Sequence, residues 1–285
     1  MAERPRVAVV FTGGTISMLP DPVTGAAVPA LDGGAILERV PGLEAIAELE
    51  PIDWGLVPAS HLRFSQILDI GSVIADAAER EDVDGVVVVQ GTDVLDETAY
   101  AWDLLHAIDT PVVVVGAMRN AGDPDYEGPR NLTDAVRVAA DPRMRGQGVA
   151  VVMDGLVLPA DDVTKTHSQS IDTFQALNVG RLGHVRDDEV VLERERRDRR
   201  MLVEWPEAAA EPVALITAVV STDGSLLRAA LEQGSRAVVV EATGSGNTDP
   251  DLLAAAVEAM DAAVPVALTT RCASGAVGPL YGFPG

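Results

Sequence analysis

The sequence predicts an α/β protein, with a large N-terminal α/β domain built on a parallel sheet and a smaller C-terminal α/β domain. Several short runs are almost wholly aliphatic and β-branched, and they lack the alternation of polar and apolar residues that a half-exposed strand shows. Helix-like stretches separate these runs. Doubly buried strands that alternate with helices are typical of a parallel α/β sheet.

The predicted elements follow one another along the whole chain. The strands are residues 6–11, 85–89, 112–115, 149–153, 213–220, 237–241 and 264–269, with a further strand-like segment at 155–159. The helices are residues 66–80, 96–108, 130–140, 223–233 and 250–262.

Charge and proline mark a boundary between the two predicted domains. Five arginines, interleaved with acidic residues, precede Pro206 and Pro212, after which the strands resume. We therefore expect an N-terminal domain over residues 1–190, a linker over 191–211 and a C-terminal domain over 212–285. The arginines are Arg194, Arg196, Arg197, Arg199 and Arg200, and their mixed-sign surroundings favour a solvated linker over an anion-binding patch.

Composition narrows the possible partners and location. The net charge of −23 argues against a broad nucleic-acid surface, which depends on clustered Lys and Arg. No apolar run has the length of a membrane helix, and the first residues lack the apolar core of a secretory signal, so we expect a cytoplasmic protein that binds neither nucleic acid nor membrane. Cys272, the single cysteine, excludes an internal disulfide, and we expect a buried thiol there.

Lysine usage singles out one residue. Of the 21 basic residues one is lysine, Lys165, and the other twenty are arginines. Arg does not give up its proton near neutral pH, whereas a desolvated Lys does, so Lys165 is a candidate for proton transfer; a surface lysine left by chance is the alternative.

Polar turns follow three of the predicted strands. Ligands of parallel α/β sheets bind beyond the carboxyl ends of the strands, so these turns are the place to look for chemistry. They are Thr12-Gly13-Gly14-Thr15, Gln90-Gly91-Thr92-Asp93 and Gly116-Ala117-Met118-Arg119. The glycines of the first turn let the backbone approach a ligand closely; a phosphate-binding turn is similar, but the spacing of a P-loop or of GxGxxG is missing.

Thr92, Asp93 and Lys165 have the residue types of a catalytic set. A threonine hydroxyl is a poor nucleophile unless a base removes its proton and the site stabilises the oxyanion. If Lys165 packs beside Thr92, the three residues supply a hydroxyl, a base and an orienting acid.

Taken together in this order, the motifs resemble those of the bacterial-type L-asparaginase and glutaminase-asparaginase family. The resemblance spans nearly the whole chain. Its carriers are Thr12-Gly13-Gly14-Thr15-Ile16, Gln90-Gly91-Thr92-Asp93 with Glu97-Thr98-Ala99-Tyr100, Gly116-Ala117-Met118-Arg119, Gly128-Pro129-Arg130-Asn131-Leu132, Asp162-Val163-Thr164-Lys165-Thr166 and Thr270-Arg271.

The resemblance implies an L-asparaginase in which Thr15 is the acylated nucleophile and Thr92, Asp93 and Lys165 form a second catalytic group, with no metal or organic cofactor. It also implies that Thr92 and Asp93 contact the substrate, with Asp93 binding its α-ammonium. The family's substrate-binding Ser-Gln pair corresponds to Ser60 and His61, so Ser60 would bind the α-carboxylate. His61 stands where the family has Gln. Asn247 matches an asparagine that approaches the site of a neighbouring subunit, which implies a homodimer or homotetramer; a turn asparagine is the alternative.

The sequence departs from the family pattern in two places. The loop after the first motif usually carries a tyrosine that helps to move the proton of the nucleophile, and here residues 24–29 contain none. Family chains usually continue past Thr270-Arg271 through a final helix, so we expect a shortened C-terminal domain. These departures leave open two alternatives to asparagine hydrolysis: an amide specificity such as glutaminase, and a weakly active or non-catalytic binder of amino acids.

Overall fold

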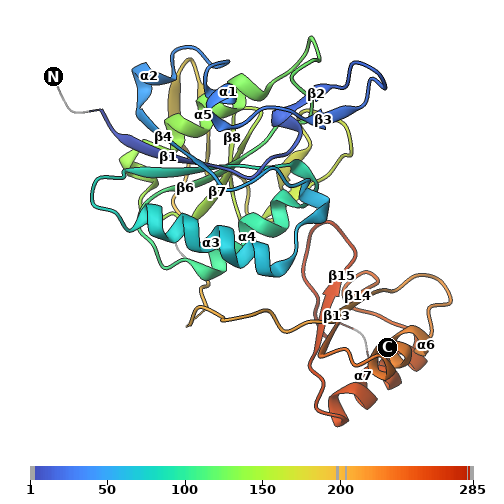
Figure 1. The fold of residues 1–285 in the computed structure, drawn as a ribbon. Helices are drawn as coiled ribbons and strands as arrows, with labels where there is room; N and C mark the ends of the chain where they lie inside the picture. Colours follow the sequence, from blue (N-terminus) through green and yellow to red (C-terminus); the bar gives the residue numbers. More distant parts are fainter. Residues whose placement is uncertain (1–3, 197–198, 203, 281, 283–285) are drawn as a thin grey trace. The chain divides into compact units, whose positions relative to one another are not determined.

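A computed structural model describes residues 4–196, 199–202, 204–280 and 282. The chain forms two compact units, Met1–Glu207 and Ala208–Gly285 (Figure 1). The N-terminal unit contains the larger sheet, and β12 of that sheet extends beyond residue 190, where we expected the first domain to end.

The larger sheet has eight strands within the described residues, in the order β12-β11-β8-β7-β6-β5-β1-β4. Neighbouring strands from β4 to β7 pair in parallel, and the strands from β8 to β12 add antiparallel pairs at one edge. The bounds are β1 Arg6–Phe11, β4 Glu48–Asp53, β5 Gly85–Val89, β6 Val112–Val115, β7 Val149–Met153, β8 Leu156–Pro159, β11 Gly183–Arg186 and β12 Glu189–Leu192.

Helices cover both faces of this sheet, which is why its central strands consist of valine-rich runs. All residues of β5, β6 and β7 are buried. In Figure 1, α3 and α4 lie on one face, and α1, α2 and α5 lie on the other. The bounds are α1 Gly33–Leu37, α2 Leu43–Ile46, α3 Phe64–Ala78, α4 Leu95–Leu105 and α5 Gly128–Ala139. The large parallel α/β domain predicted from the sequence is confirmed.

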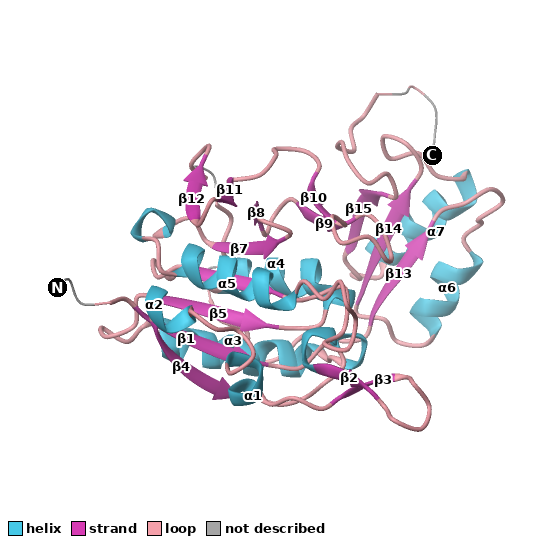
Figure 2. Ribbon diagram, turned by 90° about the horizontal axis from the view of Figure 1, so that it is seen from above, coloured by secondary structure: helices cyan, strands magenta, loops and turns pink. Residues whose placement is uncertain are grey.

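Short elements gather beyond the carboxyl ends of the parallel strands. Figure 2 shows the arrowheads of β4, β1 and β5 pointing towards the side where the β2–β3 hairpin lies. The strands β2 (Met18–Pro20) and β3 (Ala27–Pro29) pair antiparallel, as do β9 (Val163–Lys165) and β10 (Phe174–Ala176). Four 3₁₀ turns are described: η1 Thr15–Ser17, η2 Ala59–His61, η3 Thr92–Val94 and η4 Pro142–Met144.

The C-terminal unit is a smaller α/β sheet, as predicted. Its strands β13 (Val213–Thr217), β14 (Ala237–Ala242) and β15 (Val266–Thr270) are parallel. The helices α6 (Ser225–Glu232) and α7 (Pro250–Asp261) pack on one another and on the sheet. Their contact buries Leu227 and Leu252 against Val238 and Val240.

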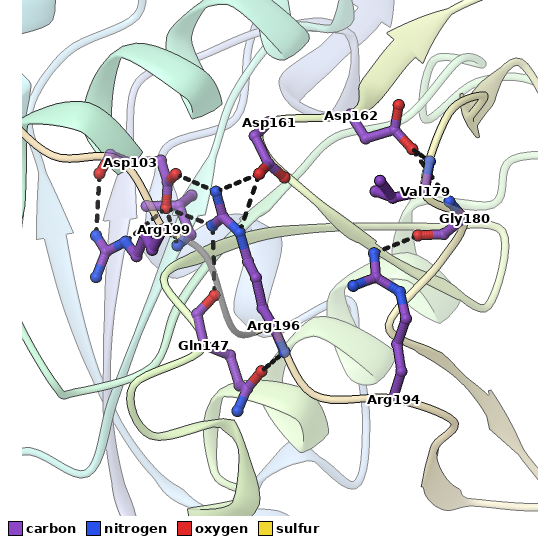
Figure 3. A network of polar contacts seen from close by, with 10 residues as sticks. Asp103, Gln147, Asp161, Asp162, Val179, Gly180, Arg194, Arg196 and Arg199 are labelled. Carbon is purple, nitrogen blue, oxygen red and sulfur yellow. Dashed lines mark hydrogen bonds and ion pairs between the residues drawn. The ribbon is translucent and has the colours of Figure 1, made fainter.

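The arginine-rich segment is not the solvated linker that its mixed charge predicted, because two of its arginines are folded against the N-terminal unit. Asp103 is 0% exposed, and Arg196 Nη2 donates to its Oδ2 at 2.7 Å while Arg199 Nε donates to its Oδ1 at 3.1 Å. Arg196 is also paired with Asp161 at 2.8 Å, as Figure 3 shows. A buried carboxylate requires such partners, and here the segment after β12 supplies them. Arg197 lies outside the described residues.

The thiol of Cys272, in the C-terminal unit, is exposed, so the expectation of a buried cysteine is wrong. Among the described residues, no helix is both long enough and apolar enough to cross a membrane.

We predict that His106 makes the N-terminal unit less stable in acid. Its side chain is buried, and burial, together with nearby Arg199, lowers its pKa from 6.5 to about 4, while Asp103 opposes the shift. Since the folded state resists protonation, its contribution to stability is complete above about pH 6.5 and is lost as pH falls towards 4. The loss approaches about 3 kcal/mol at most.

The measurement compares free energies of unfolding at about pH 7 and about pH 4.5 for the wild type and for His106→Gln, which does not titrate. We expect the variant to lose less stability between the two pH values. His61→Gln, at an exposed position, is the control and should behave like the wild type. Equal losses in the wild type and in His106→Gln would contradict the assignment.

Candidate functional site

The first strand delivers Thr15 to the carboxyl edge of the sheet. After Phe11, the Thr12 hydroxyl donates to the Val89 carbonyl at 3.1 Å, so this hydroxyl joins β1 to β5. Gly13 and Gly14 then turn the chain at φ 106° and 98°. Thr15 begins η1 and is partly buried, whereas Thr12 is 1% exposed. Of the two threonines in this motif, Thr15 is therefore the one whose hydroxyl is not used to join the strands.

The turn after β1 touches the turn after β5 through two glycines. A Cβ atom on Gly14 would clash with the backbone nitrogen and Cα of Gly91, and a Cβ on Gly91 would lie 3.1 Å from the Gly14 Cα. The two backbones are thus in direct contact. Because Thr15 follows Gly14 and Thr92 follows Gly91, the contact brings the two threonines predicted from the sequence to one place.

Thr92, Asp93 and Lys165 meet as the sequence suggested. The Lys165 ammonium donates to the Thr92 hydroxyl at 3.1 Å and lies 3.5 Å from Asp93 Oδ1. Thr92 is 5% exposed and the Lys165 side chain 17%, whereas the Asp93 side chain is 64% exposed. The hydroxyl and the amine are therefore largely shielded from water, and Asp93 presents its carboxylate to the surface.

Asp96 holds the strand that carries Lys165, a role that the sequence did not reveal. Its Oδ2 accepts from the Lys165 backbone N–H at 3.0 Å, across 69 residues of sequence. From its place at the start of α4, Asp96 looks like a simple capping residue. Its side chain instead joins α4 to β9, which also pairs with β10. The hydrogen bond from Asp96 therefore fixes the backbone from which the Lys165 side chain extends.

Ser60 and His61 lie on η2, next to the same turns. A Cβ on Gly91 would lie 2.8 Å from the Ala59 Cβ, so η2 packs against the turn that precedes Thr92. Both Ser60 and His61 are exposed, which leaves their side chains open to a ligand. Their contact with an amino-acid substrate stays a prediction.

Asn247 belongs to the C-terminal unit. Its backbone exchanges hydrogen bonds with that of Thr243, at 2.9 Å each. This pairing agrees with a tight turn, and the contribution of Asn247 to the site of another protomer stays a prediction.

Within the described residues, no cluster of three or more His, Cys, Asp or Glu side chains has the arrangement of a metal site.

The loop after η1 is the β2–β3 hairpin, and it contains no tyrosine. Val23, near its tip, is 90% exposed. A different tyrosine, Tyr126, donates its hydroxyl to the Ile16 carbonyl at 2.9 Å. No local pattern in the sequence signals this contact, because 110 residues separate the partners and Tyr126 lies between two of the recognised motifs.

This geometry can support acyl transfer. A hydroxyl hydrogen-bonded to an amine that has a carboxylate neighbour is the arrangement in which a weak nucleophile or a water molecule can be deprotonated. A second hydroxyl, on Thr15, is held nearby by the contact of the two glycines.

Comparison with known families agrees with both units. The family model "Asparaginase, N-terminal" matches residues 6–198, and "Glutaminase/Asparaginase C-terminal domain" matches residues 212–284. The chain belongs to the asparaginase family. Hydrolysis of an amide is therefore its general reaction class.

Similar proteins carry related names. A probable L-asparaginase of Deinococcus radiodurans is 33% identical over 290 residues, which cover 100% of this chain and 85% of that protein. One component of the glutamyl-tRNA(Gln) amidotransferase of Pyrococcus furiosus is 29% identical over 292 residues, covering 96% of this chain and 64% of that protein. The crystal structure of a probable cytoplasmic L-asparaginase from Campylobacter jejuni superposes with a TM-score of 0.89 at 27% identity, covering 97% of this chain and 86% of the other.

We predict that Gly14→Ala damages the site while Gly25→Ala is tolerated. Both glycines have positive φ, but a Cβ on Gly14 meets the backbone of Gly91, whereas a Cβ on Gly25 meets nothing within 4 Å. Gly14→Ala should lower the free energy of unfolding by at least about 3 kcal/mol, and Gly25→Ala by about 1 kcal/mol. Denaturant unfolding of the two variants measures the difference, and equal effects would show that the two turns are not in contact.

Proposed function

We propose that this chain hydrolyses L-asparagine to L-aspartate and ammonia through a threonine acyl-enzyme. The observation that carries the proposal is the 3.1 Å contact between the Lys165 amine and the Thr92 hydroxyl, with Asp93 beside them, in a chain of the asparaginase family. In this proposal the single lysine of the sequence is the group that moves the proton.

In this proposal Thr15 Oγ1 attacks the side-chain carbonyl carbon of asparagine. The tetrahedral intermediate collapses, the C–N bond breaks, and the amide nitrogen leaves as ammonia after gaining a proton. Water then attacks the ester on Thr15, which releases aspartate and returns the hydroxyl. Lys165, as the free amine, accepts through Thr92 the proton that the attacking Thr15 oxygen loses, and this proton passes to the leaving amide nitrogen. In the second step Lys165 likewise carries a proton from the attacking water to the Thr15 oxygen.

Substrate binding is assigned to the exposed polar groups around the threonines. The carboxylate of Asp93, being 64% exposed, is available to the α-ammonium of the substrate, and the Ser60 hydroxyl to its α-carboxylate. His61 lies next to Ser60 on η2.

We further propose a homodimer or homotetramer in which Asn247 approaches a neighbouring site, which light scattering with and without Asn247→Ala would test. A cytoplasmic location, the one in the name of the Campylobacter protein, is testable by fractionation.

A different amide is the second candidate, and the similarity to the Pyrococcus amidotransferase component is the observation that favours it. Ammonia release from L-asparagine, L-glutamine and D-asparagine at equal concentrations would separate the candidates. Faster release from an amide other than L-asparagine would replace the proposed substrate without changing the roles of the residues. Binding of L-aspartate in a calorimeter without ammonia release from any of these amides would favour a non-catalytic binder.

We predict that Thr15→Ala and Lys165→Met each lower kcat for ammonia release about 10²-fold or more, because each removes a group that forms or breaks a bond. The control is Thr133→Ala, whose hydroxyl donates to the Pro129 carbonyl within α5 and should leave kcat unchanged. If both variants release ammonia at the wild-type rate, the catalytic roles assigned to Thr15 and Lys165 are wrong.

Lys165→Arg separates the charge of the lysine from its ability to lose a proton. Arginine keeps a cation beside Asp93, yet it does not act as a base near neutral pH. We expect Lys165→Arg to be as impaired as Lys165→Met in ammonia release. Retention of most of the activity would show that Lys165 acts through its charge alone.

A further inference from the structure

Tyr126, which is distant in the sequence, forms a hydrogen bond to the turn that carries Thr15. This tyrosine precedes α5, and its hydroxyl donates to the carbonyl of Ile16 at 2.9 Å. Ile16 is the residue directly after Thr15 and is 0% exposed. A hydrogen bond to a buried carbonyl fixes the peptide that carries it, since the bond cannot be exchanged for one to water without opening the turn.

The ring of Tyr126 is itself held in place. A Cβ on Gly128 would clash with the hydroxyl end of the ring, so the first residue of α5 makes room for it. The Tyr126 backbone N–H donates to the Asp123 carbonyl at 3.1 Å. Burial raises the pKa of Tyr126 to about 12, with a further contribution from Glu127, so the phenol keeps its proton and acts as a donor.

The neighbouring residue, Glu127, holds a second turn of the site. Its carboxylate accepts from the backbone N–H of Met118 and, at 3.3 Å, from that of Arg119. These residues follow β6, and the start of that turn reaches the catalytic set, because a Cβ on Gly116 would lie 2.9 Å from Thr92 Cγ2. Two consecutive side chains therefore tie the turn after β1 and the turn after β6 to the start of α5.

Other hydrogen bonds of η1 are internal to the turn or come from the segment after β3, where the backbone N–H groups of Ala30 and Leu31 donate to the Ser17 carbonyl at 3.0 Å each. Ser17 Oγ donates to the Gly14 carbonyl at 2.7 Å, and the Met18 N–H donates to the Thr15 carbonyl. These bonds define the shape of the turn and join it to the end of the β2–β3 hairpin, whereas the bond from Tyr126 joins it to the start of α5.

We propose that Tyr126 is a positioning residue for Thr15, which holds the nucleophile turn through the Ile16 carbonyl in the space that Gly128 leaves for its ring. The inference rests on the proposed role of Thr15. It assigns Tyr126 no contact with the substrate: its removal misplaces the attacking hydroxyl and leaves amino-acid binding intact. Misplacement by about 1 Å lowers a rate by up to about 10²-fold.

The experiment compares the wild type with Tyr126→Phe and Gly128→Ala, which act on the same bond in different ways. The first removes the hydroxyl, and the second displaces the ring. Tyr100→Phe, at a phenol on the exposed side of α4, is the control. We expect kcat for ammonia release to fall about 10-fold to 100-fold in both test variants. KM, and the Kd of L-aspartate measured by calorimetry, should stay within about twofold.

Turnover is measured well below the lowest Tm and referred to the folded fraction, so a loss of stability alone leaves kcat unchanged. If Tyr126→Phe fails to fold, Gly128→Ala tests the same bond. Amide hydrogen exchange of residues 12–18 supplies a readout that needs no activity, and we expect faster exchange in both test variants.

The outcomes separate this inference from the proposed function. A wild type that releases no ammonia overturns the proposed function, while the exchange measurement still tests the hold of Tyr126 on the turn. If Thr15→Ala is inactive but Tyr126→Phe turns over like the wild type, the inference about Tyr126 alone is wrong. Unchanged exchange, or a rise in KM at constant kcat, overturns it as well.

Discussion

Contact between the backbones of Gly14 and Gly91 is the constraint on which the candidate site depends. It exists because β1 and β5 are adjacent parallel strands, so the residues that follow them leave the sheet at the same edge. With any side chain at Gly14 the two turns would have to separate. Each glycine is followed by a threonine, and the sheet thereby brings both threonines to the same edge without a long loop. The candidate site is thus built directly on the ends of two buried strands of the sheet.

Lys165 reaches the same point from a different part of the fold. Its strand, β9, follows the antiparallel strand β8, and Asp96 at the start of α4 fixes its backbone. Thr92 therefore lies on η3, and Asp96, which binds the backbone of Lys165, lies in the first turn of α4 directly after it. Both partners of the Thr92–Lys165 contact are therefore connected to the start of α4, Thr92 through the chain and Lys165 through Asp96.

The amino-acid sequence predicted correctly the strands in which every residue is buried. The central strands are buried on both faces and consist of runs of valine, and the turns after β1 and β5 carry the two threonines and Asp93. The edge strand β4 was missed because it is partly exposed and contains Pro51, which gives no run of aliphatic residues. Arg196 was misjudged because its partner, Asp103, lies 93 residues away. Asp96 and Tyr126 escaped for the same reason, since a local pattern carries no information about a distant partner.

Arg196 and Lys165, two partly or fully shielded basic residues, make different kinds of contact. Arg196 is 4% exposed in its side chain; its two Nη atoms donate to the two carboxylate oxygens of Asp103 and its Nε donates to Asp161, a task suited to a planar group with five N–H donors. At residue 165 one atom meets both Thr92 Oγ1 and Asp93 Oδ1. A compact ammonium can approach both, whereas a guanidinium would spread its charge over a wider plane. Arg196 and Arg199 therefore bind a buried carboxylate with several donors each, whereas Lys165 brings one nitrogen to two partners in a smaller space.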